Sequence, residues 1–541
     1  MTGRYYSRAL LGAGVVVAAL AAAAPASPGP QQGAQVDILI TGGEVYSGAL
    51  EQPRVADVGI VGDKVTFVGD ARAAGVTGRR QIDAKGKMVV PGFIDAHVHA
   101  TDEIASKDPE ERVLLRQLTQ GVTTNIIGVD GAGEPEITAF ARAAEAAGVG
   151  GNFAAYVGFG AIRKRVLGDD ARAPTAAELA KMKALAAQGM CEGALGLSSG
   201  LFYAPQSFAK TEEVIAVAEE SGKRGGLYDT HQRDEGNTSI GVVASTREQI
   251  RIARESGAKL HLGHFKVSSG ALPDGRSMAA LIKIVEEARS AGQEITADQY
   301  PWNASNTGLV AMAIPRWAQD GGREALLRRF DTPADLARIL KESTAFFAER
   351  GGAQNILINS AAEQPELVGR RVSEIAADWG VTPAEATVRI LKRSNASVAI
   401  FAITEPDIRA LMRQPWTMFS SDGGPRGHPR GHASYPRLYT KYVVGEQVIT
   451  RVEFVHKASA LVADTLGLKG RGYIRPGGFA DVVVIDPATF QPHATFVEPT
   501  LLSTGVDKAI VNGEVVLDGG KPTGARPGRA LLRTPPPGSC A

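Results

Sequence analysis

Residues 91–99 read PGFIDAHVH, an apolar stretch that ends in two histidines separated by one residue. Because the side chains of a strand alternate between its two faces, we expect His97 and His99 on the same face of a short strand. Seven further apolar stretches lie beside helical patterns: TTNIIGVD, NFAAYVGFG, GALGLSSG, GGLYDTH, KLHLGHFK, EITADQYP and WTMFSSDG. Eight nearly continuous apolar strands that alternate with helices predict an α/β fold with a parallel sheet. They favour a TIM-like (β/α)8 barrel over residues 91–466.

The regions on both sides of the expected barrel differ from it. Residues 36–90 and 467–533 contain short strands separated by glycine-rich turns. The Asn512-Gly513 pair is a strong signal for a hairpin. We therefore predict one small β-sandwich domain built from both ends of the chain.

A further section interrupts the alternation of strands and helices. Between about residues 302 and 400 the chain holds several helical patterns but only weak strand signals. We interpret this section as an insertion after the seventh strand that forms a lid over the active site.

Residues 1–26 have the organisation of a secretory signal peptide. Arg4 and Arg8 precede the apolar run LLGAGVVVAALAAAA, and the small residues of Ala24-Pro25-Ala26 offer a cleavage site. The alternative is an uncleaved membrane anchor, because the run is nearly long enough to span a bilayer. We expect cleavage, a periplasmic or secreted protein, and no stable membrane insertion afterwards.

The charge balance and the cysteine content argue against two further classes of protein. The chain has 59 basic and 58 acidic side chains, whereas nucleic-acid binders usually carry a basic patch or stripe. We therefore expect no nucleic-acid partner. The two cysteines are Cys191 and Cys540, the second next to the end of the chain. We expect no disulfide framework, although an exported protein would permit one.

Polar residues end several of the expected strands: His231, His264 and Asp422. In a (β/α)8 barrel the carboxyl ends of the strands gather at the catalytic face. Together with His97 and His99, these side chains suit one or two Zn²⁺ ions, with further divalent metals as alternatives. His261, three residues before His264, is expected on the opposite face. For any single histidine the alternative is a core side chain with satisfied hydrogen bonds.

The chain resembles the amidohydrolase superfamily in PGFIDAHVH, THQRDE, GHFKV and SSDG, the last followed by HPR and YPR. Within that superfamily it is similar to the N-acyl-D-amino-acid deacylase (D-aminoacylase) branch, as GALGLSSGLFYAP, RGYIRPGGFADVVVIDP and VNGEVVLDGGKPTGARPGR also indicate. The resemblance runs from about residue 36 to 533. It implies a metal-dependent barrel with a small β-sandwich and an inserted lid, and hydrolysis of an amide next to a free carboxylate.

The resemblance also implies roles for the strand-end residues. His97 and His99 match the first metal pair of the family, and His231 and His264 match the second. Asp422 matches the catalytic aspartate, which also binds metal. A carboxylate on the metal is suited to accept a proton from the attacking water and deliver it to the departing nitrogen.

A second group of residues matches the part of the family's site that holds the substrate. Lys266 matches the residue that binds the substrate carboxylate, and Tyr300 and Arg430 match its helpers. Tyr203, in SSGLFYAP, either lines the substrate pocket or only packs. The alternatives are that Lys266 and Arg430 are surface cations and that Tyr300 caps a barrel strand.

Asp130, in the stretch GVTTNIIGVDGAG, departs from the family pattern. The family usually has a cysteine there, whose thiolate helps bind the metal and can bridge two ions. A carboxylate at the end of a buried strand is costly unless something pairs with it. We expect Asp130 to ligate metal directly, with a modest shift of preference towards manganese or iron. The alternative is that it orients a ligand histidine through the ring N–H.

The expected activity is cleavage of N-acyl-D-amino acids, or of dipeptides with a C-terminal D-residue, by metal-activated water. The substrate is then a small molecule with a free carboxylate. One alternative is a cyclic-amide hydrolase of the dihydroorotase or hydantoinase kind. Those enzymes normally use a carbamylated lysine, and no lysine ends GALGLSSG. An L-specific dipeptidase is a second possibility, and a catalytically silent relative that only binds metal or a peptide is a third.

Overall fold

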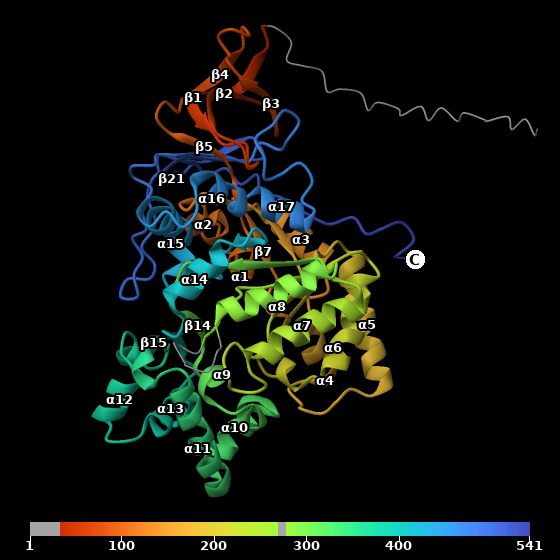
Figure 1. Cartoon of the computed structure of the whole chain (residues 1–541), viewed down its shortest axis with the longest axis vertical. Helices are drawn as coiled ribbons and strands as arrows, with labels where there is room; N and C mark the ends of the chain where they lie inside the picture. Colours follow the sequence, from red (N-terminus) through yellow and green to blue (C-terminus); the bar gives the residue numbers. More distant parts are fainter. Residues whose placement is uncertain (1–32, 269–276, 541) are drawn as a thin grey trace, which may run out of the picture.

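A computed structural model describes residues 33–268 and 277–540 of the chain (Figure 1). The expected signal peptide, residues 1–26, lies outside the described residues. Within the described ranges, no helix combines the length and the apolar character that crossing a membrane requires. Figure 1 shows three regions along the long axis: a β-rich end, a central α/β body and a mostly helical end.

The central body contains eight parallel strands among the described residues, one in each of the eight predicted stretches. Their hydrogen bonds form two arcs, β6-β7-β8 and β9-β10-β11-β12-β13-β17. The short segment β9 directly continues β8, so these nine labels correspond to eight barrel strands. Backbone bonds join the arcs: Leu195 N donates to Ala155 O on one side, and Asp422 N donates to His97 O on the other. The prediction of a (β/α)8 barrel is confirmed. The strands are β6 (Phe93–Asp95), β7 (Val122–Ile127), β8 (Asn152–Ala155), β9 (Val157–Gly158), β10 (Gly196–Gly200), β11 (Leu227–His231), β12 (Lys259–Leu262), β13 (Ile295–Gln299) and β17 (Thr417–Phe419).

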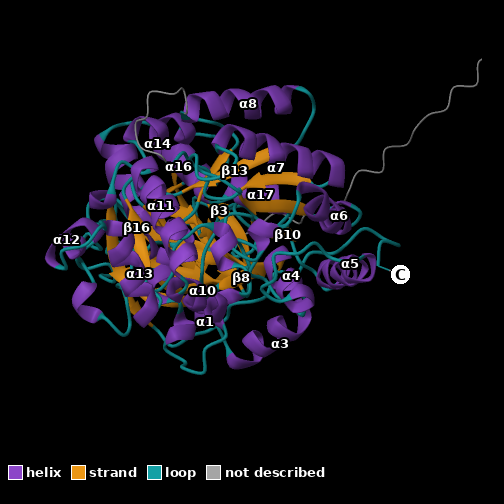
Figure 2. Cartoon of the chain, turned by 90° about the horizontal axis from the view of Figure 1, so that it is seen from below, coloured by secondary structure: helices purple, strands orange, loops and turns teal. Residues whose placement is uncertain are grey.

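Helices surround these strands, as Figure 2 shows from below. All residues of β7, β10 and β11 are buried, as expected for strands covered on one face by helices and on the other by the barrel interior. Thr175 begins one helix with a capping box, in which its side chain accepts from Glu178 N. The helices are α1 (Thr101–Ile104), α2 (Leu115–Leu118), α3 (Ile137–Ala147), α4 (Phe159–Leu167), α5 (Ala176–Cys191), α6 (Thr211–Gly222), α7 (Val242–Ser256), α8 (Met278–Ser290), α14 (Glu405–Met412), α15 (Arg430–Arg437), α16 (Arg451–Ala458) and α17 (Ala460–Leu466).

The β-rich end is one nine-stranded sheet that takes strands from both ends of the described chain. Its two halves meet where β5 runs antiparallel to β18, with Val90 opposite Val483. The Asn512-Gly513 pair joins β19 to β20 as a two-residue hairpin with positive φ at both residues. The strands are β1 (Gln35–Val45), β2 (Arg54–Val61), β3 (Lys64–Gly69), β4 (Thr77–Asp83), β5 (Met88–Pro91), β18 (Val482–Ile485), β19 (Val506–Val511), β20 (Glu514–Asp518) and β21 (Lys521–Pro522).

The segment from β14 to β16, inserted between β13 and α14, forms the mostly helical end of the molecule (Figure 1). It has its own apolar core, to which Ile339, Ile358 and Ile390 belong. It also contains an antiparallel sheet of order β14-β16-β15. The elements are β14 (Ser305–Gly308), α9 (Leu309–Ala313), α10 (Gly322–Asp331), α11 (Pro333–Glu349), β15 (Ile356–Ser360), α12 (Val372–Asp378), α13 (Pro383–Arg393) and β16 (Ser397–Ile400).

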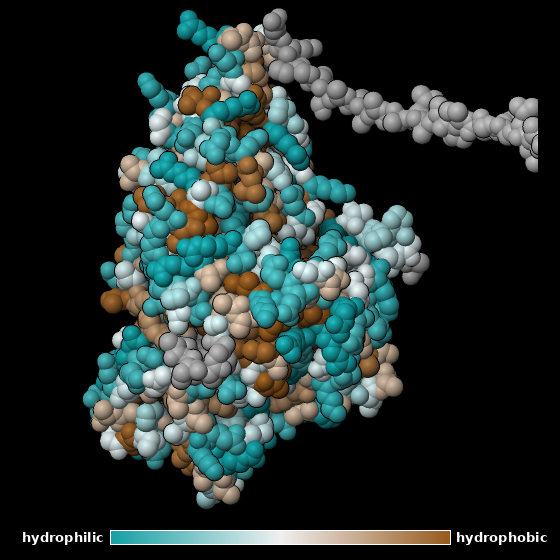
Figure 3. Space-filling model, viewed as in Figure 1, coloured by the Kyte–Doolittle hydropathy of each residue, from teal (hydrophilic) through white to brown (hydrophobic). Residues whose placement is uncertain are grey.

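The surface is mixed in character. On the face shown in Figure 3, hydrophilic residues are interspersed with smaller apolar groups. Large apolar side chains with substantial exposure come from separate segments, among them Val55, Val368 and Val497. Isolated apolar residues of this kind are normal on water-facing surfaces.

The C-terminal tail corrects one expectation from the sequence. Cys191 and Cys540 form a disulfide, with their Cα atoms 5.6 Å apart. The tail runs back along the start of the barrel strands, where Leu531 N donates to Phe153 O and the Arg533 side chain donates to Ala194 O. The expectation of no disulfide framework overlooked this one bond, because a separation of 349 residues hides the return of the chain.

Candidate metal centre

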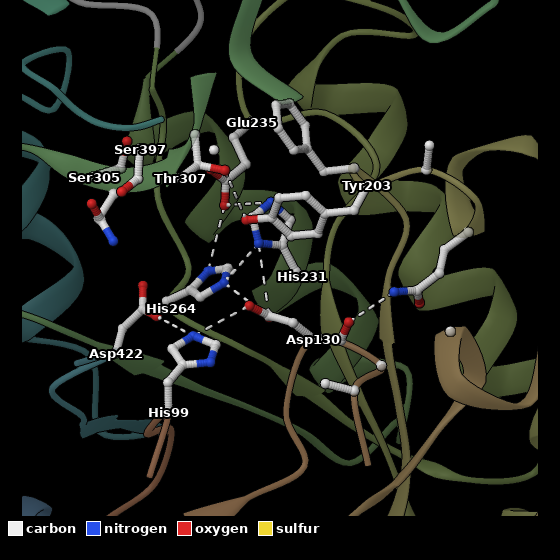
Figure 4. A pocket seen from close by; sticks show the side chains of 18 of the residues that line it. His99, Asp130, Tyr203, His231, Glu235, His264, Ser305, Thr307, Ser397 and Asp422 are labelled. Carbon is white, nitrogen blue, oxygen red and sulfur yellow. Dashed lines mark hydrogen bonds and ion pairs between the residues drawn. The ribbon is translucent and has the colours of Figure 1, made fainter. Parts of the chain in front are cut away.

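Side chains from five strand ends converge on one pocket (Figure 4). The potential metal-ligating atoms of His97, His99, Asp130 and Asp422 all lie within 4.8 Å of one another. Those of Asp130, His231 and His264 satisfy the same limit. All six residues predicted to bind metal therefore meet in two groups that share Asp130.

The backbone turns sharply at three of these residues. Asp130, His264 and Asp422 have φ values of 56°, 35° and 49°. Positive φ is uncommon for residues other than glycine and costs about 1–3 kcal/mol, so it persists where the surroundings enforce it. Each of the three follows the end of a barrel strand. The turn is therefore part of how the fold directs these side chains to the centre.

Asp130 lies between the two histidine pairs. Its Oδ1 atom is 3.4 Å from His97 Nε2 and 3.3 Å from His264 Nε2. The same atom is 3.8 Å from His231 Nδ1, and Oδ2 is 3.6 Å from His99 Nε2. Gln206 donates to the backbone oxygen of Asp130 at 2.8 Å and fixes the turn. One carboxylate thus faces all four imidazoles.

Asp422 faces the first histidine pair with one oxygen and an arginine with the second. Oδ1 is 3.2 Å from His99 Nε2, and Oδ2 is 2.6 Å from the Arg430 guanidinium. Burial favours the neutral acid, but the charges of Arg430 and the neighbouring histidines hold the pKa of Asp422 well below its usual range. Asp422 is therefore ionised at neutral pH.

The centre carries an excess of negative charge that calls for a cation. Burial disfavours a charged His97, yet Asp130, Asp298 and Asp422 together raise its pKa to about 10. Both ring nitrogens of His97 are buried and lack a hydrogen-bond partner among the described residues. Imidazole nitrogens and carboxylate oxygens are ligands that zinc and related divalent metals accept. The donor set and the orphaned imidazole fit a divalent metal ion.

Glu235 is a carboxylate of this centre that the sequence interpretation missed. Its Oε1 atom is 3.8 Å from His231 Nε2 and 3.5 Å from His264 Nδ1. It also forms an ion pair with Lys266 Nζ at 2.6 Å. The available signal was its place in THQRDE, four residues after His231.

The residues predicted to bind substrate lie in or beside the pocket. Lys266 is 5% exposed and Arg430 is 3% exposed, so neither is a surface cation. The Tyr300 ring lies next to both, 5.5 Å from Lys266 Nζ and 4.9 Å from Arg430 Cζ. Tyr203 packs its ring 4.8 Å from that of His231 and contacts Thr307 through its hydroxyl.

The pocket itself has a volume of about 650 Å³, in the range of small-molecule sites. The barrel supplies its floor. The insertion supplies part of its wall through Ser305, Thr307, Arg350 and Ser397. The insertion and the barrel therefore line the same pocket.

His261 corrects another expectation. It points into the barrel interior, because its Nε2 atom binds Asp298 Oδ2 at 2.9 Å and the same oxygen lies 3.9 Å from His97 Nδ1. Asp298 Oδ1 in turn accepts from His264 N at 3.0 Å. Strand alternation fails here because β12 ends at Leu262 and the chain turns at His264.

Known proteins resemble this chain over most of its length. A model described as the amidohydrolase family matches residues 80–517. D-aminoacylase of Alcaligenes xylosoxydans xylosoxydans is 32% identical over 92% of this chain and 98% of its own length. N-acyl-D-glutamate deacylase of the same organism is 32% identical over 92% of this chain and 97% of its own length.

Solved structures give the same result. A crystal structure of D-aminoacylase matches with a TM-score of 0.78 and 32% identity, covering 92% of this chain and 100% of that chain. N-acyl-D-glutamate deacylase from Bordetella bronchiseptica, complexed with zinc and a phosphonate mimic of the tetrahedral intermediate, matches with a TM-score of 0.77 and 30% identity. It covers 92% of this chain and 100% of that chain. D-hydantoinase has a TM-score of 0.54 at 16% identity, a likeness of fold alone.

Proposed function

The chain belongs to the amidohydrolase family, and from this premise we propose that it hydrolyses the amide bond of N-acyl-D-amino acids or of dipeptides with a C-terminal D-residue. The observation that carries the proposal is the meeting of four histidines and two aspartates beside the buried cations Lys266 and Arg430. Relatives that match over nearly the whole chain are named D-aminoacylase, N-acyl-D-glutamate deacylase and N-acyl-D-aspartate deacylase.

We assign the metal-holding role to the two groups around Asp130. His97, His99 and Asp422 would hold one ion with Asp130, and His231 and His264 would hold another. A bound divalent ion such as zinc supplies a lowered water pKa and polarises the scissile carbonyl. A binuclear metal centre in D-aminoacylase and zinc in N-acyl-D-glutamate deacylase support this choice.

Asp422 is proposed as the general acid and base. Because it is ionised at neutral pH, one of its carboxylate oxygens can accept a proton from the attacking water. The same oxygen then delivers that proton to the nitrogen of the departing amine. An amine must be protonated to leave, so both proton transfers fall to one side chain.

Lys266, Arg430 and Tyr300 are proposed to hold the substrate carboxylate. The two cations are buried beside the centre, where low dielectric strengthens their attraction for an anion. Arg430 can offer two parallel N–H bonds to a carboxylate, and it lies within reach of Asp422. This arrangement would set the scissile amide next to the proton-transfer group.

The competing functions have less support. A cyclic-amide hydrolase would need a carbamylated lysine on β10, whose residues are GLSSG. A catalytically silent relative would not need an ionised carboxylate such as Asp422, which lies between His99 and Arg430. An L-specific dipeptidase differs only in the hand of the substrate, so a substrate test is needed to separate it.

The experiment is a screen of zinc-reconstituted enzyme against paired N-acetyl-D- and N-acetyl-L-amino acids and dipeptides. The proposal predicts hydrolysis of D-substrates that carry a free carboxylate. Preference for the L-series would replace it with the dipeptidase hypothesis. No turnover of any free-carboxylate substrate would remove the deacylase function.

We further propose that the protein is exported to the periplasm or secreted. The Cys191–Cys540 disulfide supports an oxidising compartment, since cytosolic thiols are kept reduced. The signal-like pattern of residues 1–26 supports the same location. N-terminal sequencing of the protein from each cell fraction tests this, because export predicts a mature chain that begins near Ser27.

A further inference from the structure

We propose that Glu235 is a positioning residue of the metal centre: one carboxylate that holds His231 and His264 from behind and anchors Lys266 at the same point. Figure 4 shows Glu235 on the opposite side of these two rings from Asp130. The inference rests on the proposed metal-binding role of the two histidines.

The two rings present defined atoms to the centre. His231 Nδ1 and His264 Nε2 are 2.8 Å apart, and both face Asp130 Oδ1. The inner nitrogens are therefore Nδ1 of one ring and Nε2 of the second. The outer nitrogens, His231 Nε2 and His264 Nδ1, lie 3.8 Å and 3.5 Å from Glu235 Oε1.

The chemistry of imidazole then calls for an acceptor behind each ring. A neutral imidazole that gives one nitrogen lone pair to a metal carries its proton on the opposite nitrogen. His231 Nε2 is buried and has no hydrogen-bond partner among the described residues. Lys266 Nζ donates to His264 Nδ1 at 2.8 Å. An ammonium group cannot receive a ring proton, so a proton carried on Nδ1 would direct Lys266 to Glu235, its partner at 2.6 Å, and would need the Glu235 carboxylate as its own acceptor.

Glu235 has the capacity that this role needs. An ionised carboxylate offers about four acceptor sites on its two oxygens. Glu235 is 9% exposed, and its pairing with Lys266 at 2.6 Å offsets the cost of burying its charge. Carboxylates that accept from the far N–H of a metal-binding histidine fix the ring and make it a better ligand.

The loop after β11 is built to hold Glu235 still. Ser268 N donates to the backbone oxygen of Glu235 at 2.7 Å. The neighbouring Asp234 accepts from Gly236 N at 3.0 Å, Ser239 N at 2.6 Å and Gly241 N at 3.0 Å. A loop fastened by this many backbone bonds can place one carboxylate behind two rings.

The test compares Glu235→Ala and Glu235→Gln with Glu213→Ala. Glu213 is a matched control, because it is 8% exposed and pairs with Arg163 at 3.0 Å on α6, outside the pocket. The zinc dissociation constant is measured by competition with a chromophoric chelator. Thermal unfolding of the metal-free proteins is measured alongside it.

We expect Glu235→Ala to weaken zinc binding about 10- to 100-fold. Glu235→Gln should lose less, because an amide oxygen still accepts from a ring N–H. Glu213→Ala should lower the melting temperature while leaving the zinc affinity unchanged. Wild-type zinc affinity in Glu235→Ala, or an equal loss in Glu213→Ala, would overturn the proposal.

Zinc binding is read on the resting protein, so the test does not depend on the substrate. A wild-type protein that binds zinc and hydrolyses no N-acyl-D-amino acid would refute the proposed function alone. A wild-type protein that binds no zinc would refute both.

Discussion

The two histidine pairs of the centre are built in different ways. His97 and His99 come from the end of one strand; the His97 side chain is buried, and the His99 side chain is 40% exposed. His231 and His264 come from two strands, and their side chains are 6% and 2% exposed. The first pair faces Asp422, the residue that we propose for proton transfer, whereas the second has Glu235 behind it. The difference indicates an open half suited to chemistry and a closed half suited to holding an ion.

The largest expected effect comes from Asp422→Asn, which removes proton transfer from the open half. We expect kcat on an N-acetyl-D-amino acid to fall by about 100- to 10,000-fold, the usual contribution of a general acid and base. The closed half does not depend on Asp422, so at least one zinc ion should remain by elemental analysis. A variant with normal kcat would remove the catalytic assignment.

Asp130→Ala removes the carboxylate that both halves of the centre share. Loss of a residue that hydrogen-bonds to a metal ligand typically weakens metal binding about 10- to 100-fold. Loss of a direct ligand should cost more, so we expect zinc binding to weaken by about 100-fold or more. Asp130→Cys is the matched control, because a thiolate also binds zinc and can restore the site. Unchanged metal content with lower activity would instead give Asp130 an orienting role.

Lys266→Met tests whether the cation beside the closed half serves the substrate. Loss of a charge-assisted hydrogen bond of about 1.5–3 kcal/mol should raise KM about 10- to 100-fold. The control substrate is an N-acyl amine without a carboxylate, whose turnover should change little. An equal loss on both substrates would contradict carboxylate recognition by Lys266.

His97 gives the metal-free protein a pH dependence. Its folded pKa of about 10 exceeds the ordinary value near 6.5. The contribution of protonated His97 to the free energy of unfolding is therefore complete below about pH 6.5 and is lost as the pH rises towards 10. The melting temperature of the chelated protein should fall over that window, and zinc should bind more tightly as the pH rises. His97→Gln should flatten the curve, and an unchanged slope in that variant would contradict the assignment.

The smallest effect on activity is expected from Cys191→Ser with Cys540→Ser. The disulfide ties the tail near the start of the barrel strands, at the end opposite the metal centre. Its loss should cost about 2–4 kcal/mol of unfolding free energy and leave kcat/KM unchanged. A strong loss of activity without a loss of stability would show that the tail acts on the pocket.

Much of the fold follows from local pattern. The eight apolar stretches correspond to the eight barrel strands, and the Asn512-Gly513 hairpin forms as predicted, because burial and turn chemistry act within a few residues. The six residues predicted to bind metal lie close together because they stand at strand ends, which a barrel brings together.

The features that escaped prediction depend on contacts between distant segments. Glu235 acts behind two rings from different strands, and its role is visible only once β11 and β12 lie side by side. His261 and His264 both face inward, because the backbone leaves strand geometry between them and turns at His264. The alternation of side chains along a strand does not predict such a turn. The partner of Cys191 lies at the far end of the chain, and the weak strands of the insertion form only against each other.

The most direct test of the account is hydrolysis of an N-acetyl-D-amino acid by chelated enzyme before and after zinc is restored, with the L-isomer in parallel. The account predicts no turnover by the chelated enzyme, recovery with zinc, and preference for the D-isomer. Undiminished turnover without metal, or no turnover of either isomer with zinc bound, would contradict it.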